Sequence, residues 1–413
     1  MIKDLMKKYI CLMYPLATFI YTWYLFCSWV RTGIYLTAVL ALGTVFIVCL
    51  GFVTFKTFED RLFSAYLAYN LISGIWCIYY GIPFSVYIGE VSTTAVPMAL
   101  YYAGRGFDEK EAGWYYDGYL AASLFMGLFG AVLYVWAPQF YIDFSYVNEF
   151  ISKADAPTMR VRMNSLLGSG PTAVYLTYAV CVSAFFIRSR EKKKRVYGLV
   201  CLILAVLLSF MANQRSSMFS IILTVIFFSA VDYFIDKGKS KKLLWIELGA
   251  VMAFIAGIFV FARGVFEKFY IRLASIPQGF GERSESWVAA ANDMHNIWLG
   301  DGLGSRGHRA AQFQRYIVAD GGLIKLYTEM GVIGTSLIVF LLFIIYKKSL
   351  KNIGSVVSEI AVITCAILMS IGSNVLEMEL CAPAVYFCLG RAVRKLNENN
   401  RLREASRTLN MNP

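Results

Sequence analysis

The segment from Gly321 to Lys348 reads GGLIKLYTEMGVIGTSLIVFLLFIIYKK and decides the fold class. Its apolar run matches the roughly 20 residues that a helix needs to cross the hydrocarbon of a bilayer, and two lysines close it. The sequence therefore predicts a membrane-spanning helix near 321–346.

Comparable segments recur along the whole chain of 413 residues. Each is predicted to be a helix, because a backbone in lipid must satisfy its own hydrogen bonds. We therefore expect an all-α, polytopic protein of about twelve transmembrane helices, forming a single integral membrane domain over 1–413. The other expected spans lie near 10–30, 33–54, 62–81, 84–103, 115–136, 166–187, 196–212, 216–235, 243–262, 353–372 and 380–393.

Composition supports this class. The chain is 58% hydrophobic and only 16% charged, whereas a soluble domain carries about 25% charged residues. A soluble domain, a disordered chain and a nucleic-acid binder are therefore poor fits. Nine cysteines, mostly inside apolar runs and without a CxxC pair, and only two histidines predict neither a metal site nor a disulfide framework.

The net charge of +12 has two sources. If the N-terminus is cytoplasmic, 26 of the 39 basic residues fall in short inner loops or the C-terminal tail, as the positive-inside rule requires. Both termini are then cytoplasmic. The remaining basic residues concentrate in two long extracytoplasmic loops, 137–165 and 263–320. The second loop is expected to be partly helical over 283–299, where apolar residues recur at helical spacing.

Arg215 lies in Asn213-Gln-Arg-Ser-Ser217, a tight turn between two predicted spans at the outer membrane edge. One interpretation is that this arginine snorkels to the interface. The other is a fixed cation for an anionic ligand, because a guanidinium binds diphosphate oxygens bidentately.

Two further motifs follow in the second loop. Arg283-Ser-Glu-Ser-Trp287 contains either a solvated Arg283–Glu285 pair or a second ligand-binding arginine. The glycines of Gly300-x-Gly302-x-Gly304 follow no predicted strand, so they indicate a turn rather than a nucleotide-binding fingerprint.

Asp320-Gly-Gly-x-x-Lys325-x-x-x-Glu329 opens the span near 321–346. Lys325 and Glu329 are four residues apart and are expected to form an ion pair on one helix face. Asp320 is either the N-cap of this helix or, beside arginines, a general base.

In this order, the motifs resemble the O-antigen polymerases (Wzy-type) and O-antigen ligases (WaaL-type) of the glycosyltransferase C superfamily. The resemblance covers roughly Arg215 to Gly334. A weaker echo lies at Arg160-x-Arg162 and the following Gly168-Ser-Gly170-Pro171 turn.

The resemblance implies a bacterial plasma (inner) membrane enzyme with its active site on the extracytoplasmic face. Such an enzyme transfers a glycan from undecaprenyl diphosphate to a sugar hydroxyl of another lipid-linked repeat unit, without metal or other cofactor. The product would be O-antigen, and hence lipopolysaccharide, or a capsule polysaccharide. The implied partners are the lipid-linked repeat units, membrane lipid and a chain-length regulator (Wzz-type), with no nucleic acid.

The resemblance also assigns roles to residues. Arg215 and Arg283 would hold the diphosphate, and the further candidates for this role are Arg160, Arg162 and Arg306. The ligases carry a His-Asn pair where this chain has Ala319-Asp320. Asp320 is therefore the expected catalytic base of a polymerase, and His308 is the second choice.

The sequence also departs from the polymerase pattern at Arg160, and two other functions stay open. Nine residues separate Arg160 from Gly170, where the polymerases often have ten. An O-antigen ligase is the first alternative, and a transporter or flippase for lipid-linked sugars is the second. A transporter would place ionisable residues near the bilayer midplane, and among them the sequence offers Glu90 and Glu329.

Overall fold

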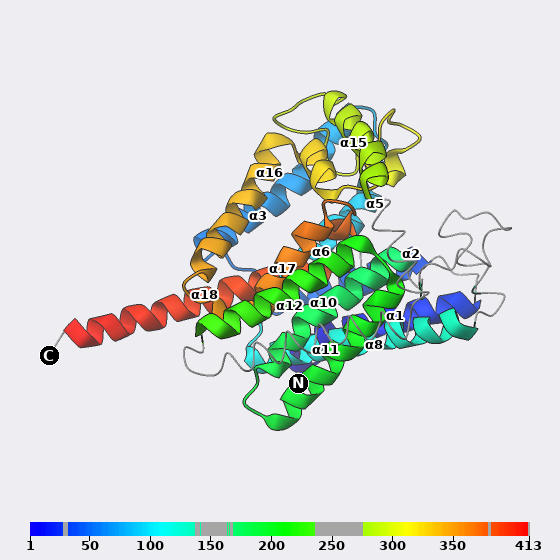
Figure 1. Cartoon of the computed structure of the whole chain (residues 1–413). Helices are drawn as coiled ribbons and strands as arrows, with labels where there is room; N and C mark the ends of the chain where they lie inside the picture. Colours follow the sequence, from blue (N-terminus) through cyan, green and yellow to red (C-terminus); the bar gives the residue numbers. More distant parts are fainter. Residues whose placement is uncertain are drawn as a thin grey trace.

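The computed structural model describes residues 1–27, 32–136, 141, 163, 165, 168–235, 276–378 and 381–411. This part of the chain is all-helical and contains no strand (Figure 1). The helices are α1 (Ile2–Cys27), α2 (Thr32–Cys49), α3 (Phe58–Ile72), α4 (Gly74–Tyr79), α5 (Phe84–Glu90), η1 (Val91–Ala95), α6 (Val96–Met98), α7 (Leu100–Gly106), α8 (Glu109–Trp136), α10 (Ser169–Ile187), α11 (Lys192–Ala212), α12 (Arg215–Ile235), α15 (Ile276–Asn292), η2 (His308–Ala310), α16 (Gly322–Ser349), η3 (Ile353–Ser355), α17 (Val357–Met369), η4 (Val375–Glu377) and α18 (Ala382–Met411).

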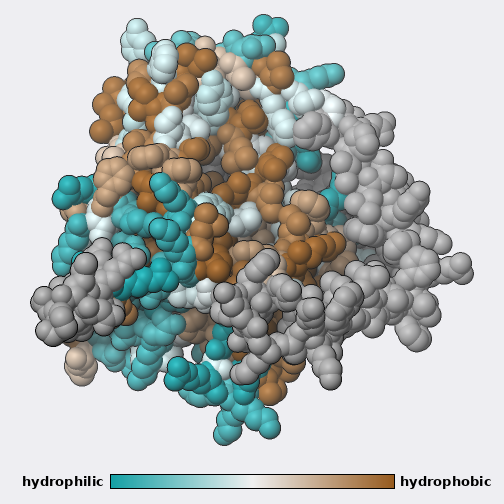
Figure 2. All heavy atoms as spheres, turned by 60° about the vertical axis from the view of Figure 1, so that its left-hand side comes forward, coloured by the Kyte–Doolittle hydropathy of each residue, from teal (hydrophilic) through white to brown (hydrophobic). Residues whose placement is uncertain are grey.

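Five helical stretches of the described chain are long and apolar enough to cross a membrane, namely α3–α4, α8, α10, α11 and α16. Large apolar side chains are exposed on them, for example Phe340 at 49% and Phe343 at 59% on α16. Figure 2 shows apolar residues over much of the middle of one face, with hydrophilic residues at its top, left and lower edges. Exposed apolar surface of this extent is unfavourable in water, so these helices indicate a multi-pass membrane protein.

Helices occur at the expected spans, except that 243–262 lies outside the described residues. The segment expected as one span near 84–103 is divided into α5, η1, α6 and α7. Its middle is a π-helical turn, and Pro97 follows at the start of α6. Because proline has no backbone N–H to donate, it interrupts the hydrogen-bond ladder at this point.

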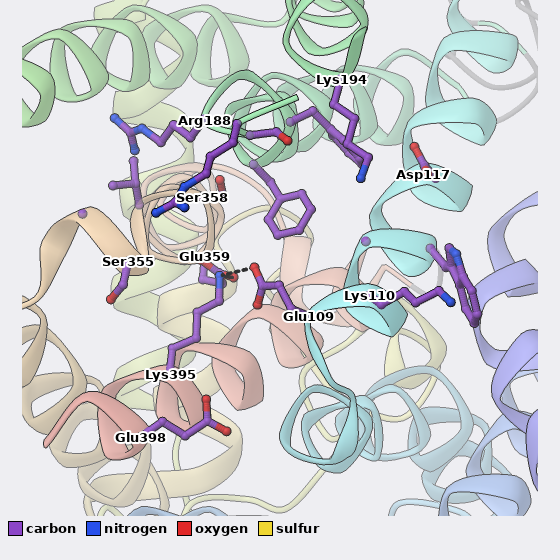
Figure 3. A pocket seen from close by; sticks show the side chains of 18 of the residues that line it. Glu109, Lys110, Asp117, Arg188, Lys194, Ser355, Ser358, Glu359, Lys395 and Glu398 are labelled. Atoms are coloured by element: carbon purple, nitrogen blue, oxygen red, sulfur yellow. Dashed lines mark hydrogen bonds and ion pairs between the residues drawn. The ribbon is translucent and has the colours of Figure 1, made fainter. Parts of the chain in front are cut away.

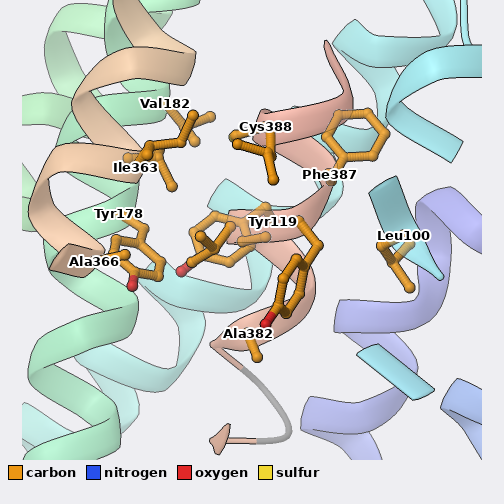
Figure 4. Packing of buried hydrophobic residues seen from close by; sticks show 14 of the residues in the cluster. Leu100, Tyr119, Tyr178, Val182, Ile363, Ala366, Ala382, Phe387 and Cys388 are labelled. Atoms are coloured by element: carbon orange, nitrogen blue, oxygen red, sulfur yellow. The ribbon is translucent and has the colours of Figure 1, made fainter. Parts of the chain in front are cut away.

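The interior is held by close packing of aromatic side chains. Helix α10 packs along α11 and α17, and α18 packs along α7. The rings of Tyr115 on α8 and Phe387 on α18 stack at 3.7 Å, and those of Tyr119 on α8 and Tyr175 on α10 lie 4.9 Å apart. Figure 4 shows Tyr119, Phe387 and their apolar neighbours in this core. The core therefore fixes the relative positions of the helices whose ends carry the polar sites.

The glycine motif of the second loop packs against a break in α16. Gly331 has φ +62° inside this helix, and the backbone N–H groups of Asp301 and Gly302 donate to the carbonyl groups of Thr328 and Glu329 at 2.9 and 2.8 Å. A Cβ at Gly300 would lie 2.3 Å from the Glu329 carbonyl oxygen. Only glycine permits this approach together with a positive φ, so the motif is a turn, as expected, and it anchors the loop to α16.

The helix of the second loop differs from the prediction. We expected it over 283–299, but α15 runs from Ile276 to Asn292 and turns follow it. The Asp301 carboxylate accepts from His295 N at 2.8 Å, and the Asn296 side chain accepts from Trp298 N at 2.9 Å. Such side-chain bonds to the local backbone compete with the hydrogen bonds of a helix. They explain why α15 ends at Asn292 although the apolar spacing continues to Trp298.

Candidate functional site

Arg283 and Asp320 form an ion pair at the N-terminal end of α16. The Arg283 Nη2 atom lies 2.9 Å from the Asp320 Oδ2 atom, and both side chains are about half exposed, at 43% and 49%. Arg283 comes from α15, which contacts α16 (Figure 1). The structure therefore brings together two of the residues that the sequence assigned to chemistry, and it leaves both accessible to a ligand.

A tryptophan one turn further along α15 fixes the backbone of this pair. The Trp287 Nε1 atom donates to the Asp320 carbonyl oxygen at 2.5 Å. The following residue, Gly321, has φ +127°, and a Cβ there would collide with the Trp287 ring at 2.6 Å. The N-cap position of α16 is occupied by Gly321, and no side chain caps the helix. The alternative that Asp320 is the N-cap is therefore wrong. The Asp320 carboxylate faces Arg283 instead.

Arg215 is the first residue of α12, outside the five membrane-crossing stretches, and it lies within electrostatic reach of Arg283. Burial, and then the positive charge of the Arg283 guanidinium, lower the pKa of Arg215 from its ordinary value. Asn213 adopts the left-handed conformation, with φ 47°, which reverses the chain between α11 and α12. Two like charges brought together by separate elements repel each other, and an anion between them relieves that repulsion.

The connection after α17 completes the site, and the sequence analysis missed it. The Gln214 Nε2 atom donates to Ser373 Oγ at 3.2 Å. The Asn374 Nδ2 atom donates to the carbonyl oxygens of Val318 and Ala319 at 3.2 and 3.0 Å, immediately before Asp320. The polar stretch Gly372-Ser-Asn374 between two apolar segments was the available signal.

Gly372 shows how close this connection comes to the arginine of α15. A Cβ built at Gly372 would lie 3.6 Å from Arg283 Nη1. The residues around the Arg283–Asp320 pair thus come from α15, from the segment before α16 and from the segment after α17. The N-termini of α12 and α16 also lie here, and helix N-termini favour anions.

The expectation that Arg306 binds diphosphate needs correction. Its side chain is fully buried, and all five guanidinium N–H groups are donated. The acceptors are the carboxylates of Asp293 and Asp301 and the carbonyl oxygens of Asp293 and Tyr316. A buried arginine with every donor occupied is a structural residue, so Arg306 holds the second loop together.

His308 is exposed in η2. Among the residues that the structure describes, no hydrogen bond or ion pair joins it to Asp320 or Arg283. Arg160 and Arg162 lie outside the described residues. The first described residue after them, Met163, donates its N–H to the Met211 carbonyl at 2.9 Å, close to the turn that carries Arg215.

Lys325 and Glu329 form the expected ion pair, and a third residue joins them. The Lys325 Nζ atom lies 3.5 Å from Glu329 and 2.7 Å from Glu90 of α5, and all three side chains are buried. Glu329 also accepts the backbone N–H of Arg306 at 3.0 Å. This cluster ties α5, α16 and the glycine turn together, so its charges are engaged in holding the second loop on the bundle.

The arrangement around Arg283 can bind an anion and accept a proton. The two arginines supply bidentate donors, and the Asp320 carboxylate supplies a base within 3 Å of one of them. In the described part of the chain, no group of three His, Cys, Asp or Glu side chains is placed to hold a metal ion. Comparison with known proteins adds no relative: no family model matches the chain, and no curated protein is significantly similar to it.

Proposed function

We propose that this chain is a polysaccharide polymerase of a bacterial plasma membrane. In this proposal, it moves a glycan from undecaprenyl diphosphate to the acceptor sugar of a second lipid-linked repeat unit, on the extracytoplasmic face, to build O-antigen or capsule. The observation that carries the proposal is the convergence of Arg215, Arg283 and Asp320 from three separate segments. The motif order that resembles Wzy-type polymerases supports the substrate class.

The proposed reaction uses these residues as follows. The Asp320 carboxylate takes the proton from the acceptor hydroxyl, and the hydroxyl oxygen attacks the anomeric carbon of the donor sugar. The bond from that carbon to the diphosphate oxygen breaks, and the lipid diphosphate leaves with an additional negative charge. Arg215 and Arg283 stabilise this developing charge, because preorganised cations at a leaving group lower the barrier.

The ion pair has a consequence for the order of events. Arg283 neutralises Asp320 at 2.9 Å. When a diphosphate arrives, it competes for the Arg283 guanidinium, which binds two oxygen atoms at a time. Asp320 is then released from its partner next to the acceptor hydroxyl, so substrate binding itself exposes the base.

The proposal includes the topology that the charges favour, with about twelve spans and both termini in the cytoplasm. Arg215, Asp320 and Gly372 lie at the ends of α12, α16 and α17 that this topology directs outward. The opposite end of α17 lies beside the basic turn between α10 and α11. The two ends of α17 therefore lie near different features, one near the proposed site and the other near a basic loop. This is in keeping with a site and basic loops on opposite sides of the membrane.

The transporter alternative finds less support. It requires ionisable groups that are free to bind and release a substrate along the bundle. Glu90 and Glu329 are both buried and both paired with the buried Lys325, and the nearby buried Arg306 is paired with Asp301. The ligase alternative is disfavoured by Ala319-Asp320 in place of His-Asn.

The experiment is incubation of the purified full-length protein in lipid nanodiscs with lipid-linked repeat units, with products separated on a gel. A ladder of long chains on the same lipid supports the polymerase. Transfer to added lipid A core, without a ladder, supports the ligase. If repeat units cross vesicle membranes and no new glycosidic bond forms, the protein is a transporter and the proposal is wrong.

A further inference from the structure

A cavity of about 850 Å³ lies at the ends of the helices that are remote from Arg283 (Figure 3). The start of α8, the turn between α10 and α11, the start of α17 and the middle of α18 line it. Helix α17 joins the two regions, because Val357 at its N-terminus lines the cavity and its C-terminus leads to Gly372. Its 13 residues separate them by about 20 Å.

Four carboxylates line this cavity, and each of them has a partner. Asp117 bonds to Tyr197 and interacts with Lys194. Glu109 is paired with Arg391 and lies 3.6 Å from Lys395. Glu359 accepts from Lys395 at 2.8 Å and from Tyr116 at 3.0 Å. Glu398 is bonded to Arg394 at 2.7 Å, and neither Arg391 nor Arg394 lines the cavity. The charges of Glu109, Glu359 and Glu398 are thus balanced by basic partners, two of which lie outside the wall.

The basic residues of the wall are in a different situation. Lys110, Arg190 and Lys194 are exposed, and Figure 3 shows Lys194 at the upper right and Lys110 at the lower right of the view. Lys194 lies 2.7 Å from Glu191, with both side chains more than half exposed, and it also interacts with Asp117 across the wall. An exposed pair of this kind contributes little. Five basic side chains (Lys110, Arg188, Arg190, Lys194 and Lys395) line the cavity against four acidic ones, so the wall carries an excess of positive charge.

Two further features of the wall suit an anion with an apolar part. The first turn of α17, with Ser358, lines the cavity and has no side-chain cap, so its backbone dipole adds positive potential. The rings of Trp114, Phe185 and Phe186 line another part of it. Lys110 Nζ lies 5.1 Å above the Trp114 ring, at the end of the membrane-crossing helix α8.

We propose that this cavity is a second ligand site, which binds a phosphate-bearing anion on the face that the charge distribution assigns to the cytoplasm. The phosphate contacts Arg190, Lys194 and the first turn of α17. Two sources share this chemistry, an anionic phospholipid headgroup and a soluble phosphate compound. The site is independent of the proposed glycan transfer, because it shares no residue with the Arg283 region.

The test uses the full-length protein purified in detergent. Native mass spectrometry measures retention of phosphatidylglycerol against phosphatidylcholine, and a thermal shift assay measures binding of sodium pyrophosphate. The variant is Arg190→Gln combined with Lys194→Gln. The matched control, Lys3→Gln combined with Lys347→Gln, removes the same charge from exposed positions that do not line the cavity. We expect the cavity variant to bind about 30-fold more weakly and the control to bind like wild type, since each of the two basic residues near an anionic headgroup contributes about 1 kcal/mol.

The lipid and pyrophosphate measurements together identify which kind of phosphate compound binds. Preference for phosphatidylglycerol that the cavity variant loses supports a lipid headgroup. A pyrophosphate-induced shift that the cavity variant loses, without any lipid preference, supports a soluble phosphate compound. Lys110→Gln serves as a second, single-site variant and should weaken the same binding. If both variants bind both probes as tightly as wild type, the proposed site does not exist.

Discussion

The long loop before α16 contains two arginines that pair with aspartates, and their surroundings differ completely. Arg306 is fully buried, and Asp293 and Asp301 occupy its guanidinium together with backbone carbonyl groups. Arg283 is 43% exposed, pairs with Asp320 through one contact and lies within electrostatic reach of a second arginine, Arg215. The comparison teaches that charge type alone does not identify a ligand site. Accessibility and the number of unoccupied donors distinguish a structural arginine from one that can bind substrate.

The largest effect is expected for Arg306→Met, which removes a buried cation and leaves two carboxylates in its place. Breaking a buried ion pair in this way costs about 3–5 kcal/mol. We expect a much lower melting temperature in detergent and little protein in the membrane. Arg315→Met changes an exposed arginine of the same loop and should leave the melting temperature unchanged. An Arg306→Met protein as stable as the control would remove the contrast between the two arginines.

Asp320→Asn should lower polymer formation by about 100-fold or more, because a general base contributes about that much. The backbone contact from Trp287 is retained, so the fold should be unaffected. Turnover of purified lipid-linked repeat units measures the effect. His308→Ala is the comparison, and it should keep full activity. The opposite result, with an inactive His308 variant and an active Asp320 variant, would transfer the base to His308.

Arg283→Lys should lower turnover by about tenfold, since lysine keeps the charge but cannot bind two diphosphate oxygens in one plane. Comparison with Arg283→Ala, which removes the charge as well, separates the contribution of bidentate binding by the guanidinium from that of its charge. Equal turnover of the lysine variant and wild type would show that bidentate geometry is not used.

The smallest effect is expected for Trp287→Phe. It keeps the ring and removes the N–H group that the Asp320 carbonyl accepts at 2.5 Å. A neutral hydrogen bond contributes about 1 kcal/mol, which corresponds to a roughly fivefold loss of turnover through misplacement of Asp320. Trp298→Phe, at an exposed position, is the matched control. Identical turnover in both variants would show that Trp287 does not position the carboxylate.

Much of the fold was predictable because hydropathy and length decide which segments become membrane helices. The i,i+4 pair of Lys325 and Glu329 was predictable for a similar reason, since it depends on local helix geometry alone. Glu90 also binds Lys325, from 235 residues away in the sequence, and no local sequence pattern predicts such a contact. The π-helical turn near Val91 likewise depends on how the helix meets its neighbours.

The site shows the same division. Motif order singled out Arg215, Arg283 and Asp320, and the structure places Arg283 against Asp320. The role expected for Arg306 was wrong, because burial depends on how the glycine turn packs on α16. The contributions of Gln214 and Ser373 also required tertiary contacts, since their segments are distant along the chain.

The central claim is that Arg215 and Arg283 act together on a leaving diphosphate. The most direct test is the turnover of purified lipid-linked repeat units by Arg215→Ala and by Arg283→Ala, with Arg315→Ala as control and melting temperatures measured in parallel. The account predicts a loss of about 100- to 1000-fold in both variants at unchanged melting temperature, with a fully active control. Turnover within threefold of wild type in both variants would contradict it.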